Sequence, residues 1–101
     1  MKTLIIVARY SMLGELEELL RDHGINAYTI FRNVTGKGVT GRVLGTFMQP
    51  DINCIILAVL PSDQVDRVVS ALKAVHVARA KAAHGQPLPL KAFSFPCEEH
   101  I

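Results

Sequence analysis

The sequence predicts one α+β domain in which four strands and two helices follow one another in the order βαββαβ. The chain has 101 residues, which is enough to build a single hydrophobic core. Four short runs are rich in branched or aromatic residues, as strands are, and two segments carry apolar residues at helical spacing. This order is the ferredoxin-like plan, in which an antiparallel four-stranded sheet carries both helices on one face.

The first half of the chain is predicted to contain a strand, a helix and a second strand. Residues 3–8, TLIIVA, form a short apolar run. Ser11 is the predicted N-cap of the first helix, and Gly24 is its predicted end. Between them, leucines at helical spacing form one apolar face: Leu13, Leu16, Leu19 and Leu20. Residues 27–34, AYTIFRNV, are the predicted second strand.

The second half repeats this pattern after a glycine-rich stretch. Residues 52–60, INCIILAVL, are the third predicted strand, in which Cys54 is expected to be a small buried apolar residue. Ser62 is the predicted N-cap of the second helix, which we expect to fray between residues 78 and 84. Residues 90–95, LKAFSF, are the fourth strand, and residues 96–101 form a tail.

The composition of the two central strands predicts an assembly of several copies. In the ferredoxin-like plan the first and third strands lie in the middle of the sheet, and here they are the most hydrophobic segments. Both are apolar at consecutive positions, which predicts that both faces of the sheet are buried. Two helices cover one face only, so we expect the other to pack against further copies in a closed homo-oligomer.

Composition and charge exclude several classes of function. The net charge of +2 is too small to indicate a nucleic-acid partner, and the central strands lack the aromatic residues of an RNA-binding sheet. The apolar run near the N-terminus is too short for a secretory leader or a membrane span, so we expect a cytoplasmic protein without membrane insertion. No nucleophile–base pair is recognisable, and we therefore expect no enzymatic activity.

The stretch from Gly36 to Gly41 fits the pattern G-x-G-x-x-G. A dinucleotide-binding turn requires these glycines between a strand and a helix, whereas here they connect two predicted strands. The stretch is either a plain hairpin excursion or a functional loop over residues 36–50. In the functional reading, glycine amides with Lys37 and Arg42 bind an anion. Apolar residues would then dock on a partner protein: Val43, Leu44, Phe47 and Met48.

Taken together, these features resemble those of the PII signalling superfamily. The likeness rests on the βαββαβ order, the strand ending in GKG, the helix PSDQVDRVVSALK and the closing strand FSFPCEEHI, and it covers nearly the whole chain as one PII-like domain, residues 1–101. The resemblance implies a homotrimer whose sheets line the interior. It also implies a projecting T-loop, here residues 36–50, that contacts a transporter or an enzyme, and an adenine nucleotide in the cleft between subunits.

The resemblance also implies which residues bind the effector. Gly36, Lys37 and Gly38 would face the intersubunit cleft, and Thr29 is similar to the family's base-contacting threonine. The family's glycine-rich phosphate grip is replaced here by HGQPLPLK, which leaves three substitutes: His84, Gly85 and Lys91. The chain also lacks the family's basic C-terminal segment. These departures favour AMP, ADP or another anion over ATP as the effector, and a protein without any effector is the remaining alternative.

Cys97 and His100 support an alternative, a metal-binding trimer. A thiol and an imidazole three residues apart are suitable ligands for Zn²⁺ or copper. The related divalent-tolerance family has the same architecture. Two ligands do not complete a site, so further ones would have to come from elsewhere in the chain or from a neighbouring subunit. The other reading of this segment is a solvated tail.

Overall fold

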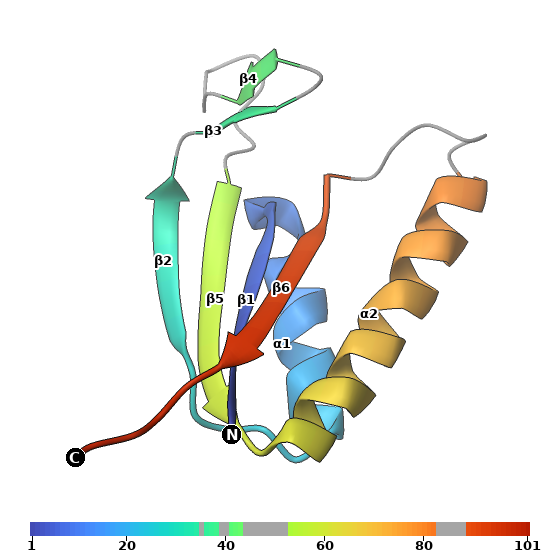
Figure 1. Ribbon diagram of the computed structural model, residues 1–101. Coiled ribbons are helices and arrows are strands. Elements are labelled where there is room, and N and C mark those ends of the chain that lie inside the picture. Colours follow the sequence, from blue (N-terminus) through green and yellow to red (C-terminus); the bar gives the residue numbers. More distant parts are fainter. Residues whose placement is uncertain (35, 39–40, 44–52, 83–88) are drawn as a thin grey trace.

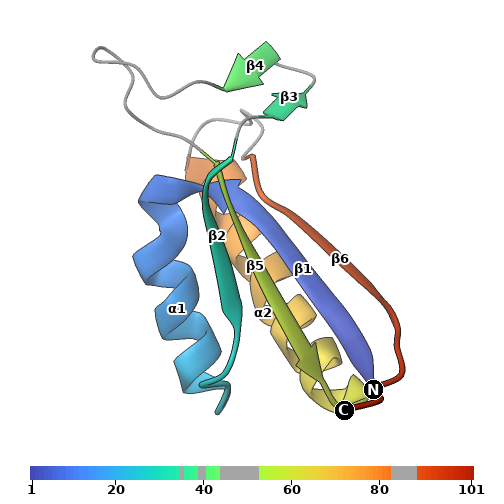
Figure 2. The same cartoon turned by 90° about the vertical axis from the view of Figure 1, so that its left-hand side faces the viewer.

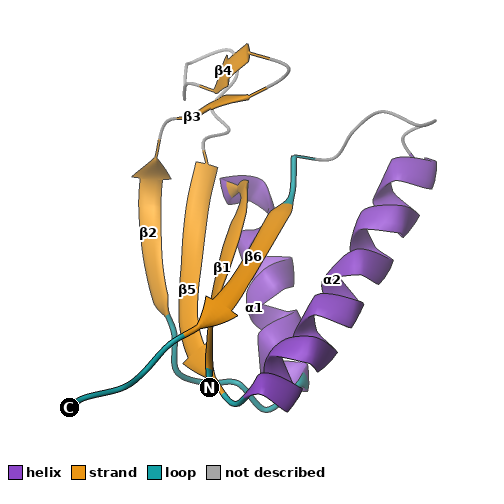
Figure 3. Cartoon of the chain, viewed as in Figure 1, coloured by secondary structure: helices purple, strands orange, loops and turns teal. Residues whose placement is uncertain are grey.

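The computed structural model describes all residues except 35, 39–40, 44–52 and 83–88 (Figure 1). Every helix and strand expected from the sequence is present, and Figure 3 marks them by colour. No helix in the described part of the chain is long and apolar enough to cross a membrane. In chain order the elements are β1 (Lys2–Arg9), a 3₁₀ turn (Tyr10–Met12), α1 (Leu13–Asp22), β2 (Thr29–Val34), β3 (Gly36–Gly38), β4 (Gly41–Val43), β5 (Asn53–Leu60), α2 (Ser62–Ala82) and β6 (Lys91–Pro96).

The main sheet confirms the predicted topology. Its strand order is β2-β5-β1-β6, and every neighbouring pair is antiparallel. The two strands predicted to be central, β1 and β5, are indeed the middle ones. Both helices lie on the same side of this sheet (Figure 1), which is the ferredoxin-like α+β arrangement.

The hydrophobic core lies between that side of the sheet and the helices. Alternate residues of β1 and β5 point into it, as the two-residue period of a strand requires. The most completely buried side chains come from both central strands and both helices: Leu4, Ile6, Leu16, Leu20, Cys54, Ile56, Val65 and Val68. Cys54 is buried there as predicted, with its sulfur 3.9 Å from the carbonyl oxygen of Arg9.

No helix in the described part of the chain covers the opposite side of the sheet, and we call this side the open face. The strand register brings Thr29, Leu57, Ile5 and Phe93 into one row across all four strands. Neighbouring rows add more apolar side chains, and several are well exposed, with Phe93 at 56% and Phe31 at 48%. The open face is therefore apolar over all four strands: Ile5, Val7, Phe31, Ile55, Leu57, Val59, Phe93 and Phe95. This confirms that the two helices cover only one face.

The helix starts differ from the prediction. Ser11 is not the N-cap of α1, because the chain first forms a 3₁₀ turn over Tyr10–Met12, and the N-cap position is Met12, without a side-chain hydrogen bond. Burial of Met12 decides this start, since the side chain is needed in the core. Ser62 is likewise inside α2, because the carbonyl oxygen of Pro61 accepts the first bonds, at 3.1 Å from the Gln64 nitrogen and 3.2 Å from that of Val65.

The helix ends also differ in part. α1 ends as predicted: Gly24 has a left-handed φ of 76°, and the amides of Gly24 and Ile25 bond back to Arg21 and Leu20 at 2.9 Å each. This is the Schellman arrangement, which needs glycine for its positive φ. α2 remains helical up to Ala82, whereas fraying from residue 78 was expected. The alanines of this last part favour a helix, and Arg79 anchors it by pairing with Glu15 of α1.

The connection from α1 to β2 is held onto the helix by a tyrosine. The Tyr28 hydroxyl donates a hydrogen bond of 2.6 Å to Oε2 of Glu17. That bond raises the pKa of Tyr28 above its usual value, and partial burial and the negative charge of Glu17 act in the same direction. The start of β2 is thereby fixed relative to α1, and β2 then runs along the edge of the sheet.

Candidate functional site

The described part of the predicted functional loop, β3 and β4, lies beyond one end of the main sheet. β1 and β2 finish at this end, and β5 and β6 begin there; we call it the loop end. Figure 2 views the molecule from the β2 edge and shows the small strands β3 and β4 beyond this end. Segments that are far apart in the sequence therefore meet at the loop end, as a binding site requires.

The base of the loop over residues 36–50 contains two short paired strands, β3 and β4, which the sequence analysis did not predict. β3 and β4 pair in an antiparallel register, with Gly36 opposite Val43, Lys37 opposite Arg42 and Gly38 opposite Gly41. Glycine has a low preference for strands, which is why the sequence did not indicate them. The G-x-G-x-x-G stretch thus lies in a hairpin and not at a strand-to-helix turn, so the dinucleotide reading stays rejected.

The hairpin leaves the main sheet through a bulge in β2. Phe31 pairs with Ile55, but the next pairing joins Val34 to Asn53, so β2 carries one extra residue. Asn33 lies in this bulge with a left-handed φ of 59°. A β-bulge bends its strand and changes the direction in which the chain continues. The bulge therefore bends the end of β2 shortly before β3 begins.

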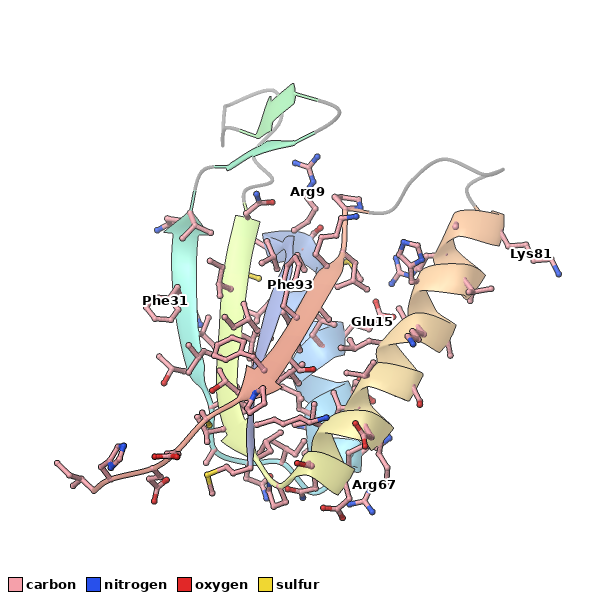
Figure 4. All side chains as sticks on the ribbon, in the orientation of Figure 1. Arg9, Glu15, Phe31, Arg67, Lys81 and Phe93 are labelled. Carbon is pink, nitrogen blue, oxygen red and sulfur yellow. The ribbon has the colours of Figure 1, made fainter. Side chains whose placement is uncertain are left out.

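Two cationic residues reach the loop end on the open face. Arg9 is the last residue of β1 and pairs with Asn53, while Lys91 is the first residue of β6 and pairs with Val7. Figure 4 shows Arg9 above the sheet at this end. Lys91 was a predicted site residue, whereas Arg9 was not. Its place at the end of a central strand, opposite the start of another, was the signal that could have identified it.

The structure separates Thr29 from the base of the loop within one chain. Thr29 is the first residue of β2, and the strand runs from there toward the loop end. It pairs with Leu57, lies on the open face and is exposed. Phe31 occupies the next position on that face. Thr29 is thus accessible to a neighbouring copy on the open face.

Several predicted site residues lie outside the described part of the chain. His84 and Gly85 belong to this group, as do three residues of the apolar loop tip: Leu44, Phe47 and Met48. Val43, the fourth apolar residue, is the last residue of β4. The proposed roles of all six remain predictions.

The C-terminal end of α2 carries basic residues, but one of them is already paired with a carboxylate. Arg79 forms an ion pair with Glu15 in the first turn of α1, although 64 residues separate them in the sequence. Lys81 is exposed and extends away from the sheet (Figure 4). The Arg79 guanidinium thus already has a counter-ion, so it is not our candidate for contact with a bound anion.

The candidate metal ligands lie at the other end of the molecule. The amide nitrogen of Cys97 is 3.3 Å from the carbonyl oxygen of Met1, which continues the pairing of β6 with β1. Nε2 of His100 is 3.7 Å from a carboxylate oxygen of Glu98, and both side chains are well exposed. Across the described residues, no three His, Cys, Asp or Glu side chains are grouped so that they could hold a metal ion. A metal site at Cys97 and His100 remains an untested prediction.

Comparisons with known proteins identify the family. The family model described as nitrogen regulatory protein P-II matches residues 1–98. The chain therefore belongs to the P-II family, as the sequence resemblance predicted. No match was found among curated proteins.

Solved structures of PII-like proteins have the same fold. CPII, a nitrogen regulatory PII-like protein from Thiomonas intermedia K12 bound to ADP, AMP and bicarbonate, is 22% identical with a TM-score of 0.66, over 93% of this chain and 84% of that one. Its apo form gives 21% identity and the same TM-score, over 93% and 85% of the two chains. A PII-like signalling protein from Thermus thermophilus is 17% identical with a TM-score of 0.59, over 93% and 83%.

Proposed function

We propose that this protein is a trimeric cytoplasmic regulator, not an enzyme, that binds a small anionic effector between its subunits and controls a partner protein through the loop over residues 36–50. The effector is an adenine nucleotide or another small anion, and the partner is a transporter or an enzyme. One observation carries the proposal: a glycine hairpin with two cationic residues stands over a basic strand end that adjoins an uncovered apolar face.

The open face supports the assembly. A face with exposed phenylalanines on two strands and aliphatic residues between them is larger than a monomer usually leaves in water. Three copies of the chain that bury these faces against one another form a closed assembly without an unmatched surface. Because the loop end borders the open face, burial of that face brings each glycine hairpin next to a neighbouring subunit. The effector site then lies between two chains.

The hairpin and its surroundings support the choice of an anion. Lys37 and Arg42 are paired in the strand register, so this small sheet carries two cationic residues. Arg9 and Lys91 lie at the same end of the sheet. Amides of glycine-containing turns bind phosphate oxygens well. In a nucleotide complex, Thr29 of β2 is our candidate contact for the base.

The ligands of a structural relative make AMP, ADP and bicarbonate the first effectors to test. CPII binds ADP, AMP and bicarbonate. This chain departs from the PII pattern before the last strand, where His84, Gly85 and Lys91 replace a glycine-rich phosphate grip. AMP and ADP have shorter phosphate chains than ATP and need fewer phosphate contacts. We therefore expect AMP or ADP to bind more tightly than ATP. Regulation then requires that the effector binds one loop conformation more tightly than another.

Isothermal titration calorimetry tests the proposal. AMP, ADP, ATP and bicarbonate are titrated into the wild-type protein, the Lys37→Ala variant and the Lys73→Ala variant. Lys73 is an exposed lysine on α2, away from the loop end, and serves as the matched control. We expect Lys37→Ala to weaken nucleotide binding by about tenfold, as removal of a charged hydrogen bond does. Absence of heat from every ligand with the wild type would contradict the effector role.

A further inference from the structure

A cation–π contact joins the bulge of β2 to the turn that follows β1. The Arg32 guanidinium lies over the Tyr10 ring, with its central carbon 5.7 Å from the ring centroid. Its Nη1 also donates a hydrogen bond of 3.2 Å to the Tyr10 hydroxyl. Arg32 lies inside the bulge, directly before Asn33, and Tyr10 directly follows Arg9. The pair therefore links the two strand ends from which the candidate effector site is built.

The hairpin depends on this bulge for its orientation. Among the described residues, β3 and β4 pair with each other and not with a strand of the main sheet. Without such pairing, the direction of the hairpin is decided by the segments that lead into it. The described one is the bulge, where Asn33 holds a conformation that few residues other than glycine adopt. A contact that keeps the bulge in place therefore acts on the hairpin as well.

We propose that Arg32 is a positioning residue and that its contact with Tyr10 holds the glycine hairpin in the orientation that binds the effector. This inference rests on the proposed function, but its structural part can be tested without any ligand. Arg32 does not need to touch the effector. It acts because the guanidinium fixes the bulge relative to the 3₁₀ turn, and the bulge in turn directs Gly36 and the strand that follows.

Glycine-selective ¹⁵N labelling gives a direct test in the ligand-free protein. The chain has seven glycines, which yield a simple amide spectrum. Gly36, Gly38 and Gly41 report on the hairpin, and Gly24 at the far end of α1 reports on the rest of the fold. We expect Arg32→Ala to shift or broaden the three hairpin signals and to leave the Gly24 signal unchanged. Arg32→Lys, which keeps a cation near the ring, should restore them in part.

Arg67→Ala is the matched control, because Arg67 is an exposed arginine that pairs with Asp63 on α2. This variant should leave the hairpin signals in place. A contact that only stabilises the fold would lower the melting temperature of Arg32→Ala without moving the hairpin signals relative to the wild type. That outcome, or unchanged signals at an unchanged melting temperature, would overturn the inference.

Calorimetry with ADP then tests whether the orientation of the glycine hairpin affects effector binding. We expect Arg32→Ala to weaken ADP binding about three- to fivefold, the range of an exposed cation–π contact, with Arg67→Ala unchanged. If the wild type itself binds no nucleotide, the proposed function fails, and the glycine spectra still decide whether Arg32 positions the hairpin. If ADP binds the wild type and Arg32→Ala equally although the hairpin signals move, the proposed link to the effector is wrong.

Discussion

The two faces of the main sheet are built from the same strands but obtain their cover in different ways. On the helix side, alternate residues of β1 and β5 are almost fully buried by leucines and valines of α1 and α2. On the open face, the intervening residues of the same strands remain partly exposed except for the buried Thr3, and aromatic side chains of β2 and β6 flank them. One face completes the fold of a single chain, whereas the other is the face that we propose is covered by further copies of the chain.

The largest expected effect comes from a charge on the open face. Phe93→Asp should abolish assembly, because a carboxylate in an apolar interface is strongly unfavourable in every subunit. Sedimentation velocity should then show a single chain in place of the wild-type assembly. Val77→Asp is the matched control, since Val77 is even more exposed, at 64%, but lies on α2 away from the open face. Equal dissociation of both variants, or a wild type that sediments as a single chain, would contradict the claim that the open face is the assembly interface.

A deletion on the helix side should affect the stability of the chain itself. Leu16 is 1% exposed and packs in the core between α1 and the sheet. Leu16→Ala should lower the free energy of unfolding by about 2–5 kcal/mol, through lost burial and the cavity left behind. Urea denaturation measures this loss. Leu19→Ala, at a partly buried position of the same helix, should cost clearly less. Similar losses at the two positions would contradict the burial pattern of α1.

The fold could be predicted from the sequence because the spacing of apolar residues in strands and helices follows which side chains are buried. The ferredoxin-like order placed β1 and β5 in the middle of the sheet, and their uninterrupted apolar runs indicated that two helices on one face could not cover them. The single chain shows alternating burial instead of burial on both faces. This is the pattern expected when the second cover comes from outside the chain.

The details that the sequence did not predict depend on contacts between distant residues. α1 begins one residue later than predicted, with Met12 at the N-cap position and its side chain buried in the core. The glycine hairpin is held by cross-strand pairing, to which glycine contributes no side chain. The pairing of Arg79 with Glu15 was not apparent from the sequence, because 64 residues separate the two. Thr29 was placed correctly on the second strand, but its distance along β2 from the hairpin became apparent only in the fold.

A smaller effect on the helix side concerns pH. Tyr28 donates to Glu17, and its pKa is raised, first by that hydrogen bond. A raised pKa in the folded state gives stability that is complete below the unfolded value of about 10 and is lost as pH rises through the folded value. Tyr28→Phe should therefore cost about 0.5–1.5 kcal/mol at pH 7 and less at pH 11.

Urea denaturation at both pH values measures the cost of Tyr28→Phe. Glu17→Gln provides the control, because it keeps an acceptor but removes the charge. In that background the difference between pH 7 and pH 11 should shrink. A cost of Tyr28→Phe that is equal at pH 7 and pH 11 would show that the bond does not contribute as argued.

The smallest effect is expected for the ion pair that joins the two helices near the loop end. Arg79 and Glu15 have side chains that are 48% and 39% exposed, so solvent and salt screen their attraction. A double-mutant cycle with Arg79→Ala and Glu15→Ala should give a coupling energy of about 0.2–1 kcal/mol that decreases in 1 M salt. Because Glu15 already neutralises Arg79, calorimetry should show the same nucleotide affinity for Arg79→Ala as for the wild type. A marked loss of affinity would instead make Arg79 part of the effector site and extend that site from the open face to the end of α2.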